Sequence, residues 1–333
     1  MIYDGGAADW SPEDIQSVLD VVAEVTQALT RAGHTVTKVP VLPDLAWLDT
    51  IRQSDVVFNL CEGVAGASYM EYKVASAIEL TGVPFTGGSA WMMTVCHRKP
   101  LLNALLESAG LPIPRWYLPS QSATPADFPL PAIVKPAEED ASVGIEQRSV
   151  VTTREELTAR VVAMREQYGE LMVQEYVRGR EIAAAIVGTH TLPLSEIDFG
   201  RMPDGAWHIV SFDAKWAESS PEFAGTQPVC PAKVDPELER HILDTAHAAW
   251  RTVDGSGYGR VDMRVDDDGV PWVLEVNPSP DISTDAGLAN MARAYGWSYD
   301  ALVSQVLDAA VAPTAAKRPR RVLTPSTDAQ QVA

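Results

Sequence analysis

Two short apolar segments near the carboxyl end, each with polar side chains at alternate positions, constrain the fold most. Residues 259–265 alternate as a β-strand does, and the polar face of this strand carries Arg260, Asp262 and Arg264. After an Asp-Asp-Asp-Gly turn, residues 272–277 form the returning strand, whose polar face carries Glu275 and Asn277. A β-hairpin of these strands therefore predicts two carboxylates and one amide around a single cation.

Asp262, Glu275 and Asn277 are the candidate metal ligands. Magnesium prefers hard oxygen ligands and usually takes only a few from protein, while nucleotide phosphates and water complete its shell. We expect Mg²⁺, with Mn²⁺ as an alternative ion. A plain hairpin with solvated acids is the competing interpretation. Glu275 is nevertheless flanked by apolar residues, and an acid in so apolar a strand needs a partner.

Composition limits the class of protein. The chain has 333 residues, 46% of them hydrophobic, so it can bury a sizeable core and is expected to form two or three domains. Its formal net charge of −19 argues against a nucleic-acid partner, because a phosphate backbone requires a basic surface. The sequence shows no signal peptide, no long apolar run and only three cysteines, which lie far apart. We expect a cytoplasmic protein without a membrane partner.

The first 95 residues predict an open α/β domain. Ser11 and Pro12 provide an N-cap and a first helical position for a helix that we expect to reach about Ala32. Strands are expected over residues 35–40, 55–60 and 83–86, with a helix over residues 71–80. Alternating strands and helices are typical of a parallel sheet.

A series of motifs follows over most of the chain. In order, they are Asn59–Gly63, Gly82–Gly88, Lys99, Ile133–Pro136, Ser142–Gly144, Val173–Glu181, Lys215, Arg260 with Asp262, and Glu275 with Asn277. Each motif alone is weak, but their order and spacing resemble the D-alanine–D-alanine ligase branch of the ATP-grasp superfamily. The resemblance implies an α/β ATP-grasp fold, with an N-terminal α/β domain (1–95), a central lobe (96–175) and a C-terminal lobe that holds the metal (176–312).

The resemblance also assigns the phosphate-binding groups of an ATP site to Lys99, Lys135, Ser142 and Lys215. Lys99 lies near the start of an expected helix, where a cation is unfavourable unless an anion is close. A solvated Lys99 is the alternative. Lys135 ends an apolar strand, and Ser142 lies in an acidic loop, residues 137–144, that would cover the phosphates.

The segment 171–181 resembles the hinge between the two ATP-grasp lobes, where the adenosine would bind. Main-chain groups near Glu175 and Val177 could pair with the purine edge, and the side chain of Gln174 or Glu175 could accept from its amino group. Glu181 could bind the ribose hydroxyls. A salt bridge from Glu181 to Arg178 or Arg180 is the alternative.

The resemblance implies an ATP-dependent carboxylate–amine ligase. Transfer of the γ-phosphoryl group converts a carboxylate into an acyl phosphate, from which an amine displaces phosphate. Arg260 matches the family arginine that stabilises the oxyanion, and Lys215 matches the lysine of the loop that covers the reacting phosphate. The substrates would be small, amino-acid-like molecules, and a homodimer is left open. A phosphotransferase and a non-catalytic nucleotide-binding protein are the alternatives.

Several positions depart from the family pattern around the substrates. The family's first-substrate glutamate has no counterpart in residues 1–10, and the loop 61–68 lacks the usual His-Gly pair. Trp216 stands where tyrosine is frequent, either as an apolar wall or as a packing residue. By simple count, Ala286 replaces a serine that holds the second substrate, for which Ser283 or Thr284 could substitute. We therefore expect a ligase for a different amino acid, or a ring-closing reaction.

Other catalytic patterns are missing from the sequence. The glycines form neither a dinucleotide-binding fingerprint nor a P-loop, the serines lack a nucleophile elbow, and the histidines lack metal-ligand spacing. Residues 313–333 combine a basic stretch with a polar end and are expected to be a disordered tail.

Overall fold

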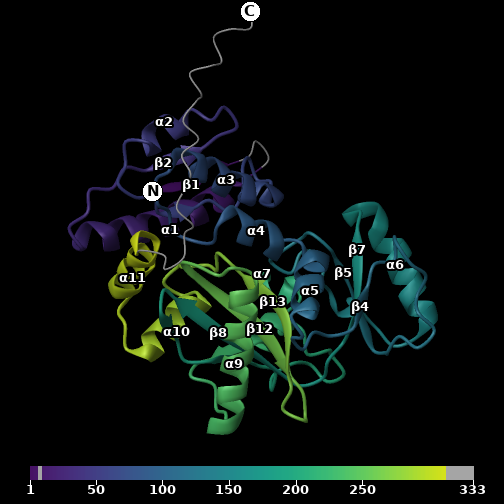
Figure 1. Ribbon diagram of the computed structural model, residues 1–333. Helices are drawn as coiled ribbons and strands as arrows, with labels where there is room; N and C mark the ends of the chain where they lie inside the picture. Colours follow the sequence, from purple (N-terminus) through teal and green to yellow (C-terminus); the bar gives the residue numbers. More distant parts are fainter. Residues whose placement is uncertain (7–9, 313–333) are drawn as a thin grey trace, which may run out of the picture.

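The computed structural model describes residues 1–6 and 10–312, so the tail expected over 313–333 lies outside the described residues. Three sheets divide this part of the chain. Figure 1 shows the N-terminal domain stacked on the C-terminal lobe, with the central lobe to one side. This mixed α/β arrangement agrees with the expected fold class. The domain boundaries near residues 95 and 175 stay predictions.

The N-terminal domain is built on a parallel sheet with the strand order β2-β1-β3. Its strands are β1 (Ile2–Asp4), β2 (Val39–Val41) and β3 (Asn59–Leu60). Its helices are α1 (Pro12–Arg31), α2 (Trp47–Ile51), the 3₁₀ turn η1 (Ser68–Met70) and α3 (Glu71–Thr81). Helix α4 (Ala90–Cys96) follows and packs on α3 and on the C-terminal lobe.

The strands expected over 35–40 and 55–60 are shorter than predicted. β1 offers only three pairing positions to β2, so residues 35–38 have no ladder to join. The segment expected as a strand at 83–86 makes a single parallel bridge between Val57 and Phe85. The β-branched residues by themselves therefore predicted longer strands than this sheet contains.

The central lobe is a four-stranded antiparallel sheet with the order β4-β7-β5-β6. Its elements are β4 (Trp116–Tyr117), β5 (Ala132–Pro136), the 3₁₀ turn η2 (Gln147–Ser149), β6 (Val150–Val151), β7 (Leu171–Glu175), α5 (Lys99–Ser108) and α6 (Arg154–Tyr168). Helix α6 begins with a capping box, in which Thr153 and Glu156 satisfy each other's backbone amides, and it packs on β5.

The C-terminal lobe holds a six-stranded sheet with the order β11-β10-β8-β12-β13, and β9 pairs with β8. Its strands are β8 (Arg180–Val187), β9 (His190–Thr191), β10 (Ser195–Asp198), β11 (Gln227–Val229), β12 (Tyr258–Val265) and β13 (Pro271–Asn277). Its helices are α7 (Phe212–Trp216), α8 (Pro221–Ala224), α9 (Pro236–Thr252), α10 (Gly287–Tyr295) and α11 (Tyr299–Val311).

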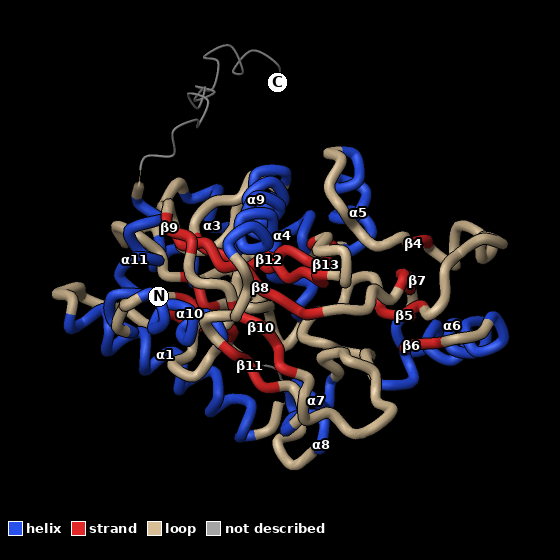
Figure 2. Tube along the Cα trace, turned by 90° about the horizontal axis from the view of Figure 1, so that it is seen from below, coloured by secondary structure: helices blue, strands red, loops and turns tan. Residues whose placement is uncertain are grey.

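Apolar residues cover this sheet on both faces over part of its length. The alternating residues Val261, Met263 and Val265 pack with α9, α4 and α5 in one core. Residues at one end of β8 and β12 join a second core with α1, α10 and α11. Figure 2 shows the neighbouring strands β8, β12 and β13 running side by side beneath α9. The polar groups of the β12–β13 hairpin are therefore mounted on a rigid, packed support.

Gly179 lies between β7 and β8, where the two ATP-grasp lobes meet. Its φ is +139°, and a Cβ atom there would lie 2.0 Å from the Val265 carbonyl oxygen. Gly110 also has a positive φ, +74°, but a Cβ atom there meets nothing within 4 Å. Only glycine avoids both the strain and the clash at position 179.

We predict that Gly179→Ala lowers the free energy of unfolding by more than about 2 kcal/mol, since backbone strain and a backbone clash act together. The matched control Gly110→Ala should cost only about 1 kcal/mol, from strain alone. Urea unfolding of both variants measures the difference. Equal losses of unfolding free energy in the two variants would contradict the claim that the Val265 backbone leaves no room for a side chain at position 179.

Candidate active site

The β12–β13 hairpin brings the predicted metal ligands together. Its antiparallel register places Asp262 opposite Glu275 and Arg260 opposite Asn277. The register shifts just after Asp262, as at a β-bulge, which is a common way to aim a side chain at a site. Asp262 also forms a two-pronged ion pair with Arg260, at 2.7 and 2.9 Å.

The two carboxylates differ in their electrostatic surroundings. Burial raises the pKa of Asp262 to about 6, even though Arg260 opposes the shift, and the nearby Glu275 adds to it. Burial also acts to raise the pKa of Glu275, but the charges of Lys99, Arg260 and Lys135 outweigh it and the pKa is lowered. Glu275 is therefore the carboxylate on which the site's cations converge.

These groups fit a magnesium ion. Asp262 and Glu275 are neighbouring carboxylates with hard oxygen donors, and burial opposes their ionisation. A divalent cation would therefore offset their shared charge. The third predicted ligand, Asn277, already accepts a hydrogen bond at its Oδ1 from the Ser279 amide, at 2.9 Å. Their role as ligands stays a prediction.

Lys99 and Lys135 are both buried, in contrast to the solvated alternative for Lys99. Lys99 is the first residue of α5. Its ammonium group donates to the Glu139 carbonyl and lies 3.4 Å from the Asp140 carboxylate. These oxygens supply the negative charge that a lysine at a helix N-terminus requires.

Lys135 is the penultimate residue of the buried strand β5 and acts on the same centre. Burial, aided by the charge of Lys99, lowers the pKa of Lys135 to about 8, while Glu275 and Glu181 oppose the shift. Two lysines and two acids from four separate elements, α5, β5, β8 and β13, therefore share one electrostatic centre. This convergence agrees with the placement that the sequence predicted for phosphate-binding groups.

The acidic loop 137–144 is docked on the C-terminal lobe. Ser142 has a φ of +63°, and its hydroxyl donates to the Val210 carbonyl at 2.8 Å. The indole of Trp216 donates to the Ala141 carbonyl at 3.0 Å. Trp216, 56% exposed, is thus neither a buried packing residue nor a bare wall, because it fastens the loop. The Ser142 hydroxyl is engaged with protein here, which the sequence did not predict.

Lys215 lies beside this fastening. It belongs to the short helix α7, and its ammonium lies 5.3 Å from the centre of the Trp216 ring. Among the described residues it has no ion pair. Lys215 therefore remains available to an anion under the loop.

The hinge segment holds the predicted adenosine-binding residues Gln174, Glu175 and Val177. Gln174 is 1% exposed, and its Nε2 has no hydrogen-bond partner in the described part of the chain. A buried amide without a partner is costly and points to a ligand. The Glu175 amide donates to the Arg115 carbonyl at 2.8 Å, which continues the sheet beyond β4.

Glu181 is paired, but with an arginine that the sequence did not suggest. Its carboxylate lies 2.9 Å from Arg264, whereas Arg180 pairs with Glu196. Arg264 is buried and its guanidinium stacks over the rings of Tyr176 and Phe199. The alternation of β12 placed Arg264 on the polar face, and that signal could have identified it as a site residue.

His97 is a second residue that sequence reasoning missed. It lies 3.1 Å from Glu71 and 3.7 Å from Asp140, so it connects α3 to the acidic loop. Burial lowers the pKa of His97, although Asp140 opposes the shift. A lone histidine next to Arg98 carries no motif, and only the folding together of three segments gives it these partners.

Residues 278–286 follow β13 and carry the positions that the sequence predicted for binding of the second substrate. The hydroxyl of Thr284 donates to Glu24 at 2.8 Å, and that of Ser283 to Asp281 at 3.0 Å. Both hydroxyls proposed to replace the missing serine are thus already engaged. Ala286 caps α10 without a side-chain hydrogen bond.

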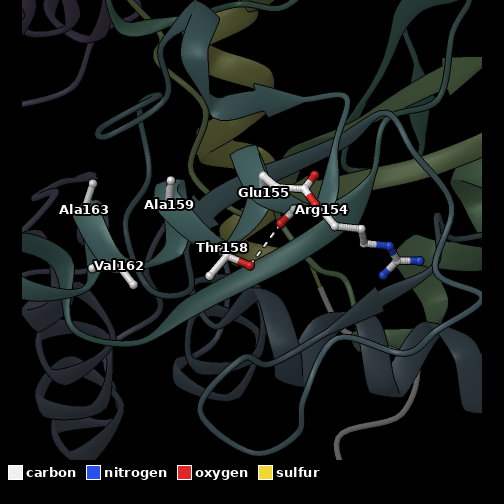
Figure 3. A pocket seen from close by; sticks show the side chains of 6 residues that line it. All are labelled: Arg154, Glu155, Thr158, Ala159, Val162 and Ala163. Atoms are coloured by element: carbon white, nitrogen blue, oxygen red, sulfur yellow. Dashed lines mark hydrogen bonds between the residues drawn. The ribbon is translucent and has the colours of Figure 1, made fainter.

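A separate hollow of about 640 Å³ lies on the outer face of α6. Figure 3 shows its lining, with the Thr158 hydroxyl bonded to the Arg154 carbonyl of the same helix. None of the residues predicted to form the site lines it. The hollow is a surface feature of the helix and belongs to no converging set of polar groups.

Comparison with known proteins decides the family. The protein-family model described as D-ala D-ala ligase C-terminus matches residues 105–308. The chain belongs to the D-alanine–D-alanine ligase family. A D-alanine–D-alanine ligase of Xylella fastidiosa is 32% identical over 297 residues, covering 85% of this chain and 91% of the relative. One of Erythrobacter litoralis is 30% identical and covers 88% of each chain.

A further relative and two solved structures are also similar to this chain. A Sinorhizobium fredii protein described as uncharacterized protein y4sG is 31% identical over 265 residues, which cover 78% of this chain and 75% of that protein. In solved structures, the D-alanine–D-alanine ligase of Bacillus anthracis complexed with ATP matches with a TM-score of 0.71 at 20% identity, covering 93% of this chain and 96% of that one. VanG D-Ala:D-Ser ligase of Enterococcus faecalis gives 0.73 at 18% identity, covering 93% and 98%.

Membership of this family confirms the expected ATP-grasp fold and the class of reaction, an ATP-dependent ligase that forms a carbon–nitrogen bond. It favours that class over a phosphotransferase or a non-catalytic nucleotide-binding protein. Within residues 1–6 and 10–312, no helix is long and apolar enough to cross a membrane.

We predict that kcat/KM for ATP falls as pH rises through about 8. Lys135, whose pKa is lowered to about 8, loses its proton and its positive charge in that range. The loss should approach tenfold per pH unit above that value. Lys135→Arg should remove this break, since a guanidinium stays protonated. Steady-state kinetics from pH 6.5 to 9.5 compare the two. An unchanged break in the variant would show that another group causes it.

Proposed function

We propose that this protein binds ATP with Mg²⁺ and joins the carboxylate of one amino-acid-like substrate to an amine through an acyl phosphate, giving ADP and phosphate. The observation that carries the proposal is the convergence of buried Lys99 and Lys135 on Glu275, beside the Arg260–Asp262 pair. Buried cations gathered beside a carboxylate suit the charge that develops on a transferring phosphate.

The residues of the site have distinct roles in this reaction. A carboxylate oxygen is a poor leaving group, and its phosphorylation turns it into a good one. Lys99 and Lys135 would offset charge on the ATP phosphates, and Lys215 would cover the phosphate that is transferred. Gln174, Glu175, Val177 and Glu181 would hold the adenosine. Ser142 could reach a phosphate only by releasing Val210.

Arg260 would act in the second half of the reaction. Attack of the amine on the acyl phosphate makes a tetrahedral oxyanion, which collapses with loss of phosphate. The neighbouring Asp262 raises the pKa of Arg260, so the guanidinium stays charged at every working pH. A fixed cation beside the reacting carbon stabilises that oxyanion, and no covalent enzyme intermediate is needed.

A magnesium ion held by Asp262, Glu275 and Asn277 would supply positive charge between the phosphates, and Mn²⁺ could serve in its place. Glu275 is the ligand that we expect to matter most, because its pKa is lowered and its carboxylate is ionised at neutral pH.

Membership of the family specifies the substrates less directly than it specifies the reaction. The names of the relatives indicate D-alanine and D-serine as their substrates. In this chain the substrate side differs, since Trp216 fastens the loop and the hydroxyls of Ser283 and Thr284 are engaged. We therefore propose condensation of other amino acids, or closure of an amide ring within one molecule. Cytoplasmic location and a homodimer stay predictions, and sedimentation would test the dimer.

The test is release of ADP and phosphate over a panel of amino acids and dipeptides, with mass spectrometry of the products. We predict a condensed product that has lost one water, formed with stoichiometric ADP. Glu275→Gln should lower turnover by at least about 100-fold, because it removes a charge from the reacting centre. The control Glu155→Gln changes an exposed acid of α6 and should leave turnover unchanged.

Two results would count against the proposal. A phosphorylated compound that never condenses would make the protein a phosphotransferase. ATP binding without turnover over the whole panel would make it a nucleotide-binding protein.

A further inference from the structure

Arg264 is a buried cation that joins strand β12 to the predicted adenosine-binding hinge. The residue is 4% exposed, and the register of β12 on β8 places it directly opposite Glu181. Its Nη2 lies 2.9 Å from the Oε2 of Glu181. Asp262, two residues earlier in β12, lies on the same face of the sheet, because Met263 between them packs in the core on the opposite face. Arg264 and Glu181 therefore share a sheet face with a predicted metal ligand.

Two main-chain carbonyl groups and two aromatic rings fix the orientation of the Arg264 guanidinium. Its Nη1 donates to the Gly179 carbonyl at 3.1 Å, and its Nη2 donates to the His208 carbonyl. The guanidinium carbon lies 5.6 Å from the centre of the Tyr176 ring and 5.3 Å from that of Phe199. A planar guanidinium that is hydrogen-bonded at its edges and packed against rings has little freedom to turn. It thus presents its charge in one fixed direction.

Glu181 uses only one of its carboxylate oxygens in this pair. Oε2 meets Arg264, whereas Oε1 makes no hydrogen bond or ion pair within residues 1–6 and 10–312. The side chain keeps 19% of its surface exposed, and Oε1 is not buried, so a ligand can reach it. An ionised carboxylate oxygen accepts hydrogen bonds, and the hydroxyl groups of a ribose are donors. The ion pair therefore leaves open the oxygen that binding of a ribose requires.

Gln174 gives an independent sign that a ligand binds at this hinge. The register of β7 on β5 pairs Met172 with Lys135, so Gln174, two residues along β7, lies on the same face of the central sheet as Lys135. The Nε2 atom of Gln174 is buried and has no partner in the described part of the chain. A buried donor in this state is costly, and an acceptor atom of a bound ligand would satisfy it.

A second arginine–glutamate pair lies beside the first and allows a comparison. Arg180, the neighbour of Glu181 in β8, forms a two-pronged ion pair with Glu196 of β10, at 2.6 and 2.7 Å. Both carboxylate oxygens of Glu196 are engaged in this pair. Alternation along β8 directs Arg180 to the sheet face opposite that of Glu181. The Arg180 pair therefore has the same chemistry as the Arg264 pair but lies away from the predicted adenosine.

We propose that Arg264 is a positioning residue of the nucleotide site. It holds the Glu181 carboxylate with Oε2 toward the guanidinium and Oε1 toward the ligand, where Oε1 accepts a hydrogen bond from a ribose hydroxyl. Arg264 itself touches no nucleotide. This inference rests on the proposed function, in which Glu181 binds the ribose, and it adds the group on which the geometry of that contact depends. The site consequently distinguishes a ribonucleotide from a deoxynucleotide only while Arg264 is present.

The test is the affinity of the protein for ADP, 2′-deoxy-ADP and 3′-deoxy-ADP in the presence of Mg²⁺, measured by isothermal titration calorimetry. These probes bind without an amino-acid substrate. We expect ADP to bind at least about tenfold more tightly than the analogue that lacks the bound hydroxyl, because the hydrogen bond is made to a charged group. Arg264→Met should reduce this ratio of affinities at least about fivefold, since the Glu181 carboxylate is no longer held.

Matched variants separate positioning from folding. Arg264→Lys keeps the charge without the planar fork and should retain part of the ratio. Arg180→Met removes the neighbouring pair and should leave the ratio unchanged. Glu181→Gln should lower the ratio, and its combination with Arg264→Met should lower it no further, because both residues act through one contact. The thermal midpoint of each variant shows whether it is folded.

The outcomes are distinguishable. A ratio that falls in Arg264→Met and persists in Arg180→Met supports the inference. A ratio near 1 in the unchanged protein, or an unaltered ratio in folded Arg264→Met, overturns the inference while ADP still binds, and leaves the proposed function intact. Failure of ADP to bind at all overturns both. Should Arg264→Met not fold, Arg264→Lys is compared with Arg180→Lys, and equal ratios in these two variants overturn the inference.

Discussion

The balance of buried charge at the β12–β13 hairpin is the constraint on which the rest of the site depends. Asp262 and Glu275 lie side by side on neighbouring strands, and burial opposes the ionisation of both. Arg260 is bound to one acid, while Lys99 and Lys135 act on the other from the central lobe. Removing any one of these groups leaves the others with an uncompensated charge, which is costly inside a protein. The two lobes are therefore held in register by their electrostatics as well as by their cores.

The acidic loop 137–144 contacts groups from the central lobe and from the C-terminal lobe. Trp216 and Val210 hold the loop from the C-terminal lobe, and Lys99 holds it from below through Asp140. His97 connects the same Asp140 to Glu71, the first residue of α3. The acidic loop thus occupies with its own oxygens a place where phosphate oxygens are expected, so binding of ATP must exchange one set of anionic contacts for another.

Sequence patterning predicted the elements with long, regular alternation or clear caps. The hairpin, the buried strand that carries Lys135 near its end and the helices α1 and α3 were all expected, because each is specified by residues close in the chain. Period-2 alternation and a tight turn also predicted that Asp262 and Glu275 lie opposite each other. The short parallel strands were overestimated, since their length is set by β1, a three-residue partner far away in sequence.

Contacts between distant segments could not be predicted in this way. Arg264 binds Glu181 from another strand, Ser142 donates to Val210, and His97 gains its partners only when three segments fold together. Such pairings depend on tertiary geometry, and a local pattern gives only the type of residue.

The most direct measurement follows the oxygen atoms of the reaction. When the carboxylate of a turned-over substrate is labelled with heavy oxygen, an acyl phosphate route must deliver one labelled oxygen to each phosphate released. Mass spectrometry of the phosphate reads this directly. Labelled phosphate formed together with condensed product is the result that the charge arrangement predicts. Unlabelled phosphate alongside the same product would show that the carboxylate is never phosphorylated, and would contradict the account.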